Sequence, residues 1–98
     1  MDDDRSRIRE LLRAITIFLR SHIISKAIEA VDRELRELSS DEFINEILEY
    51  ARDSNVAIEE AIFVKVLTWL DALEARGLEI EIDKKLVVDT VKRVLGIP

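Results

Sequence analysis

Apolar side chains recur at helical spacing along nearly the whole chain. In the first segment they follow the i, i+3, i+4, i+7 pattern of a helix with one buried face, which predicts a helix over residues 4–20. The carboxylates of Asp2, Asp3 and Asp4 stand at its start, where they can cap the helix and complement its dipole. The stripe consists of Ile8, Leu11, Leu12, Ile15, Phe18, Leu19 and His22.

A second helical stripe follows and predicts a helix over residues 25–38. At about 100° per residue, its centre lies roughly 170° around the helical wheel from the first stripe. Because one straight helix cannot turn both faces to one core, we expect a break within residues 20–25, with Ser21 or Ser25 capping the second helix. The alternative is a single long helix between two separate cores. The stripe consists of Ile24, Ala27, Ile28, Val31, Leu35 and Leu38.

Polar residues mark the limits of the next two helices. Ser40 or Asp41 follows the second stripe and predicts the cap of a helix over residues 41–53. Asn55 then offers a left-handed residue at the end of that helix. The next apolar stripe, over residues 56–76, is wide enough to require neighbours on two sides, so this helix is predicted to be the central one.

The end of the chain combines an extended segment with a last helix. Gly77 signals the end of the fourth helix, and residues 78–82 then alternate apolar and acidic side chains. This alternation is compatible with a short strand, but no partner strand is predicted, so we favour an extended linker with three apolar side chains on the core. Asp83 predicts the cap of a helix over residues 83–95.

These elements predict an all-α fold: a compact, non-repetitive five-helix globular domain that comprises residues 1–98. A chain of 98 residues with 48% hydrophobic residues is long enough to bury a core and too apolar to be disordered. The chain has no cysteine, which excludes disulfides, thiolate metal sites and a thiol nucleophile.

Charge and hydropathy limit the partners and the cellular location that the sequence predicts. A net charge of −6 argues against nucleic acid or an anionic membrane as the main partner. No apolar stretch approaches the roughly 20 residues needed to span a bilayer, and the acidic residues 1–4 do not resemble a signal peptide. We therefore expect a monomeric protein of the cytoplasm, or of an expression host's cytoplasm, that requires no partner.

Residues that could perform chemistry are few. The only histidine, His22, ends an apolar stripe and is predicted to be a packed or half-exposed imidazole near a helix end, not a catalytic base or metal ligand. The carboxylate pairs Glu59 with Glu60 and Glu79 with Glu81 are interpreted as solvated, because nothing indicates the desolvated pocket that a general acid needs. We therefore predict no enzyme, no cofactor, and no catalytic, cofactor-binding or metal-ligating residue.

The charged side chains are predicted to form ion pairs. Four i, i+4 pairs lie on helix surfaces: Glu29 with Arg33, Asp32 with Arg36, Lys85 with Asp89, and Asp89 with Arg93. Residues 25–53 hold nine acidic and four basic side chains. Arg9, Arg13 and Arg20 share one side of the first helix, either as a basic stripe for phosphate or an acidic partner, or facing the chain's own acidic second and third helices. We favour the second interpretation, because no aromatic residue accompanies the arginines.

A few isoleucines stand outside the core pattern. Ile17 lies opposite the apolar stripe of the first helix, beside Arg13 and Arg20. If Ile17, Ile23 and Ile24 align on the surface, they form a candidate patch for a weak protein contact.

The style of the whole sequence resembles that of a computationally designed all-α protein. There is no glutamine, the only methionine is Met1, and the predicted helices contain neither glycine nor proline. Capping residues stand at most predicted starts, and charges of both signs alternate on exposed faces. The β-branched residues within helices, Ile17 and the 78–82 linker are less regular than an idealised design, and a small natural helical protein would share such features.

This resemblance implies a designed helical fold or scaffold protein with no evolved biochemical activity. The alternative is a helical protein–protein interaction module, either a natural adaptor or a designed epitope or binding scaffold.

Overall fold

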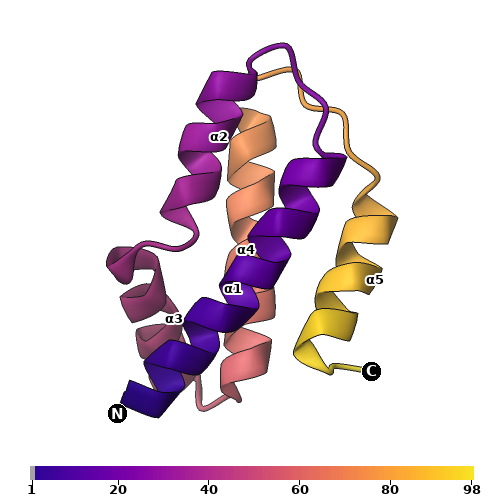
Figure 1. Ribbon diagram of the computed structural model, residues 1–98. Helices are drawn as coiled ribbons and strands as arrows, with labels where there is room; N and C mark the ends of the chain where they lie inside the picture. The colour runs from indigo at the N-terminus through magenta and orange to yellow at the C-terminus, as the bar shows by residue number, and fades with distance from the viewer. Residues whose placement is uncertain (1) are drawn as a thin grey trace.

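Five α-helices account for most of the chain in the computed structural model, which describes residues 2–98, with side chains from Asp3 onward. The elements are α1 (Asp2–His22), α2 (Ile28–Glu37), α3 (Asp41–Ser54), α4 (Ile58–Ala75) and α5 (Lys84–Leu95) (Figure 1). All five predicted helices are present, and no strand forms within the described residues. The fold is therefore all-α, as predicted.

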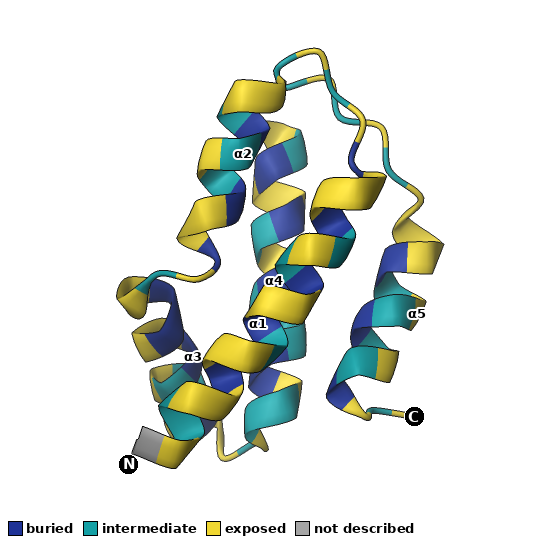
Figure 2. Ribbon diagram, in the orientation of Figure 1, coloured by how far each residue is buried: buried dark blue, intermediate teal, exposed yellow. Residues whose placement is uncertain are grey.

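Two helices share the central position. α4 packs against α1, α3 and α5, in agreement with its wide apolar stripe, whereas α1 contacts all four other helices. In Figure 1, α1 crosses in front of α4, with α2 and α3 on one side and α5 on the other. Figure 2 shows buried positions on every helix alternating with exposed positions on the outside. Among the side chains of residues 3–98, all the buried ones are apolar.

The predicted break between the first two helices is confirmed, and the single long helix is excluded. α1 ends at His22 and α2 begins at Ile28, three residues later than expected. Val31, Leu35 and Leu38 of the second stripe thereby join the same cluster of buried residues as the stripe of α1, whereas Ile24 and Ile28, predicted in that stripe, are exposed. At the start of the chain, α1 begins at Asp2, so Asp3 and Asp4 lie in its first turn. The predicted capping by Asp2 concerns a side chain outside the described residues.

The predicted cap of α2 is wrong. Its N-cap residue is Ala27, which makes no side-chain capping hydrogen bond. Ser21 lies within α1 and donates to the carbonyl oxygen of Ile17 at 3.1 Å. Ser25 Oγ accepts from the Ala27 amide at 3.0 Å and donates to the Leu78 carbonyl at 2.7 Å. The Ser25 hydroxyl therefore joins two connecting segments instead of capping a helix.

The segment 78–82 does have a backbone partner. Ile24 and Glu81 exchange both backbone hydrogen bonds, at 3.0 and 2.8 Å, and form an isolated antiparallel bridge. The two connecting segments consequently run side by side at one end of the molecule (Figure 1). As predicted, the linker remains extended and packs its apolar side chains, Leu78, Ile80 and Ile82, against the core.

The helix limits predicted at Ser40, Asn55, Gly77 and Asp83 are confirmed, whereas α4 begins at Ile58, two residues later than predicted. Ser40 Oγ accepts from the Phe43 amide at 3.2 Å, and Asp83 Oδ1 accepts from the Leu86 amide at 3.1 Å. Asn55 adopts the left-handed conformation, with φ 54° and ψ 47°. Gly77, with φ 74°, follows the last residues of α4 in a conformation that favours glycine.

The start of α4 has no side-chain cap, so a substitution there is expected to stabilise the fold. Ala57 has the extended backbone of an N-cap residue (φ −65°, ψ 153°), nearly that of the serine that caps α3 (φ −72°, ψ 154°). We expect Ala57→Ser to raise the free energy of unfolding by about 0.5–1 kcal/mol, because the serine hydroxyl can accept a hydrogen bond from a backbone N–H of the first turn that has no partner within the helix. Glu60, at the third helical position, is also the residue type that completes a capping box with this serine. Chemical denaturation measures the change.

The matched control for this substitution is Ala27→Ser at the start of α2. Ala27 has φ −98° and ψ 51°, a backbone that does not place a hydroxyl at the helix end. An equal gain in stability from both serines would show that capping geometry is not the cause.

Candidate functional site

The arginines of α1 face acidic residues of the chain itself. Arg9 binds Asp41 of α3 with an N–O distance of 2.8 Å, and Arg20 lies 3.3 Å from Asp32 of α2. This confirms the structural interpretation for two of the three arginines singled out, whereas Arg13 forms no ion pair within the described residues. The surroundings of this side of α1 therefore favour packing within the chain over binding of phosphate.

The four predicted i, i+4 ion pairs do not form. Among the described residues, none of them brings nitrogen and oxygen within 4.0 Å, and nearly all the observed pairs join different helices. Asp32, for example, lies against α1 instead of Arg36. An exposed i, i+4 pair contributes only a few tenths of a kcal/mol, which is too little to hold two long side chains when another geometry is available.

One ion pair fixes the start of α5 against the end of α4. The Lys84 ammonium lies 2.9 Å from a Glu74 carboxylate oxygen and 3.6 Å from one of Asp71. The hydrogen bond from Lys84 to Glu74 and the negative charge of that carboxylate raise the pKa of Lys84, and Asp71 adds to the effect.

This raised pKa predicts a pH-dependent contribution to stability. Since the ammonium is favoured in the folded state, the contribution is complete below the unfolded-state pKa of about 10.4 and disappears as pH rises through the higher folded-state pKa. Over a series from pH 7 to 11, we expect Lys84→Gln to reduce stability by a constant amount at pH 7–9 and to approach the wild type only above about pH 10.4. Denaturation curves over this range measure the difference. Lys85→Gln, at an exposed neighbouring lysine, should show no such convergence.

His22 and the isolated carboxylate pairs remain at the surface. His22 is exposed at the end of α1, where its ring stacks on Phe18 with 4.2 Å between centroids. Its Nδ1 lies 2.9 Å from the Phe18 carbonyl oxygen. Glu59 forms an ion pair with Arg7. Among the side chains described, no three histidine, aspartate or glutamate residues gather as a metal site would require.

The three isoleucines proposed as a contact patch do not act together. Ile17 and Ile24 are 63% and 68% exposed, but Ile23 is only 5% exposed. The Ile23 amide continues the hydrogen bonding of α1 by donating to Leu19 at 2.9 Å, and its side chain joins the core. The prediction that Ile23 contributes to the contact surface is therefore wrong, while Ile17 and Ile24 remain available.

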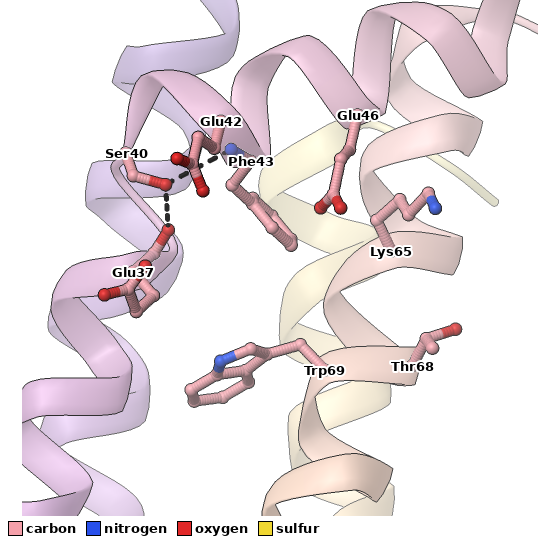
Figure 3. Close-up of a pocket in the computed structure, with 8 residues that line it drawn as sticks. All are labelled: Glu37, Ser40, Glu42, Phe43, Glu46, Lys65, Thr68 and Trp69. Carbon is pink, nitrogen blue, oxygen red and sulfur yellow. Dashed lines mark hydrogen bonds between the residues drawn. The ribbon is translucent and has the colours of Figure 1, made fainter.

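A hollow that the sequence analysis did not predict lies between the α2–α3 corner and α4 (Figure 3). We call it the α3/α4 hollow; its volume is about 340 Å³. Phe43 and the partly buried Trp69 provide aromatic surface, and Glu42 and Glu46 stand at its rim. The lining residues are Glu37, Ser40, Glu42, Phe43, Glu46, Lys65, Thr68 and Trp69.

A second hollow of about 330 Å³ continues along α3 and shares Glu46 and Lys65 with the first. It adds Glu49, Tyr50, Asp53 and Ser54 to the lined surface. The acidic residues at positions 42, 46, 49 and 53 follow the spacing of one helix face, and this was the signal in the sequence. From the sequence, the acidic residues of the third helix were expected instead to face the arginines of the first helix.

Most of the acidic rim is not neutralised within the described chain, and only Asp53 at its end has a partner, Arg52, at 3.4 Å. Neither Glu42 nor Glu46 has a basic nitrogen within 4.0 Å, and the same holds for Glu37 and Glu49. Lys65 is the one basic side chain that lines the two hollows, and its ammonium lies over the Tyr50 ring, 5.4 Å from the centroid.

Comparison with known proteins gives no relative on which a function could rest. Protein-family models, curated proteins and solved structures all fail to match the chain. None of the described helices is long and apolar enough to cross a membrane.

Proposed function

We propose that this chain is a designed helical scaffold, whose role is to hold a stable fold and which has no evolved biochemical activity. The observation that carries the proposal is the agreement between local signals and the fold. Ser40, Asp83, Asn55 and Gly77 each end or begin a helix where the sequence alone places that limit. Such consistency between local preference and global structure is the aim of protein design.

A thermal melt followed by circular dichroism tests this proposal. Natural mesophilic domains unfold near 45–65 °C, whereas idealised designs often remain folded above about 90 °C. We expect the helical signal to survive at 90 °C and to be the same at two protein concentrations a hundredfold apart. A cooperative transition near 55 °C would contradict the proposal.

A second candidate function is a helical protein–protein interaction module, and the exposed side chains of Ile17 and Ile24 favour it. A second copy of the chain is the simplest partner for exposed apolar side chains of this kind. In that case the melting temperature rises with concentration, because association stabilises the folded state. The double variant Ile17→Ser, Ile24→Ser should remove this dependence, whereas Leu86→Ser, at a leucine on α5 that is 40% exposed, should keep it.

A further inference from the structure

We propose that the α3/α4 hollow is a docking site for a basic peptide segment with an apolar side chain between its arginines or lysines. The proposal rests on the interaction-module candidate and names a partner chemistry for it. It concerns a different surface from Ile17 and Ile24, so a failure of peptide binding at the hollow can be distinguished from a failure of self-association through these isoleucines.

The aromatic surface gives the hollow its apolar component. Phe43 is 9% exposed, and its ring points into the space above Trp69 (Figure 3). The volume of about 340 Å³ lies at the lower end of the range of ligand sites, and suits one or two side chains more than a large ligand. An aliphatic side chain of a partner can therefore lie against the two rings.

The rim supplies the charge that selects the partner. Figure 3 shows the carboxylates of Glu42 and Glu46 on either side of Phe43. With Glu49 and Asp53 they form a stripe in which like charges are three or four residues apart, an arrangement that destabilises a helix. Asp53 pairs with the neighbouring Arg52 at 3.4 Å, but Glu42, Glu46 and Glu49 have no basic nitrogen within 4.0 Å among the described residues, so a cationic partner would relieve the repulsion between them.

A side chain of α4 shows where a partner's cation can bind. Lys65 holds a cation over Tyr50, so the chain's own ammonium occupies the position that a partner's cation would take.

The length of the acidic surface favours a peptide over a small cation. The rim continues from Glu37 along α3 to Asp53 and spans both hollows. A single ammonium or guanidinium group would meet only part of this surface, whereas a segment with several basic residues meets all of it.

Trp69 is the only tryptophan of the chain, so its fluorescence reports directly on the hollow. The probe is a capped hexapeptide with four arginines and two leucines, titrated at low and high salt. We expect a saturable change in Trp69 emission, with an affinity that falls at least tenfold between 50 and 500 mM salt, because surface charge interactions are screened. Replacing both leucines by serine should weaken binding at least fivefold. Undiminished binding of the serine peptide would overturn the apolar part of the proposal.

Matched variants locate the site. Glu42→Gln with Glu46→Gln should weaken binding at least tenfold, whereas Glu10→Gln with Glu29→Gln makes the same charge change on other exposed surfaces and should alter it less than twofold. Lys65→Gln should strengthen binding severalfold, because it removes the competing cation. This opposite sign cannot arise from damage to the fold, and melting temperatures of all variants provide a further check.

Three results overturn the proposal. Equal weakening by both glutamate pairs means that binding reflects net charge alone. Unchanged binding in the Glu42, Glu46 variant places the peptide elsewhere. Loss of binding in the Ile17, Ile24 variant alone moves the interaction to the isoleucines, which ends this proposal and leaves the interaction module intact.

Discussion

Leu12→Ala is expected to lower the free energy of unfolding by about 2–5 kcal/mol. Leu12 is fully buried, and it lies in the middle of α1, the helix that contacts all four others. Because α1 packs against every other helix, movement of one element is not expected to fill the cavity. The expected loss is a large share of the roughly 5–15 kcal/mol that stabilises a typical domain.

Guanidinium chloride denaturation, followed by the helical circular dichroism signal, measures this loss. The slope of the free energy of unfolding against denaturant concentration should stay the same as in the wild type. The matched control is Leu86→Ala on α5, which removes the same atoms from a leucine that is 40% exposed. We expect that variant to lose less than about 1 kcal/mol. Similar losses at Leu12 and Leu86 would show that the core does not centre on α1.

The helices could be predicted from the sequence because their signals are local. A helical period needs only residues three and four apart, and the caps at Ser40 and Asp83 bond an amide three residues ahead. The break after α1 could also be predicted, since two stripes on opposite faces cannot share a core. Ser25 failed as a cap because its hydroxyl has a second partner, the Leu78 carbonyl, which is distant in the sequence.

Contacts between distant segments could not be predicted in the same way. Glu81 pairs with Ile24, and Lys84 reaches Glu74, through an arrangement of helices that apolar periodicity does not specify. The exposed ion pairs were predicted wrongly for a related reason. Their energies of a few tenths of a kcal/mol are too small to decide which partner a long side chain adopts.

Only the charged part of the candidate site could be predicted from the sequence. The acidic spacing on α3 is readable, but the hollow exists only because packing of α3 on α4 brings Phe43 near Trp69. Trp69 lies on the apolar stripe of α4, yet it is only partly buried at the edge of the core. Periodicity identifies the face on which a residue lies, and it does not distinguish the centre of that face from its rim.

Val66→Asp is expected to be more damaging than any cavity. Val66 is fully buried on α4, in a core whose described buried side chains are all apolar, so an aspartate there finds no partner for its charge. Such a substitution typically lowers the free energy of unfolding by more than about 4 kcal/mol. For a domain of this size, this corresponds to a fall in melting temperature of at least about 15 °C. Thr68→Asp, two residues away at an exposed position, makes the same change in charge and should be nearly neutral.

The pH dependence of this loss separates a buried charge from a packing defect. Burial disfavours the ionised form, so the pKa of the introduced aspartate should be raised in the folded state above its unfolded value of about 3.9. The folded state then binds the proton more tightly, and stability must rise as pH falls from 7 towards 4. We expect denaturation curves of Val66→Asp to approach those of the wild type over this range, while the deficit of Leu12→Ala stays constant. A deficit at Val66 that does not change with pH would mean that water reaches the position and that α4 is not closed off by α1, α3 and α5.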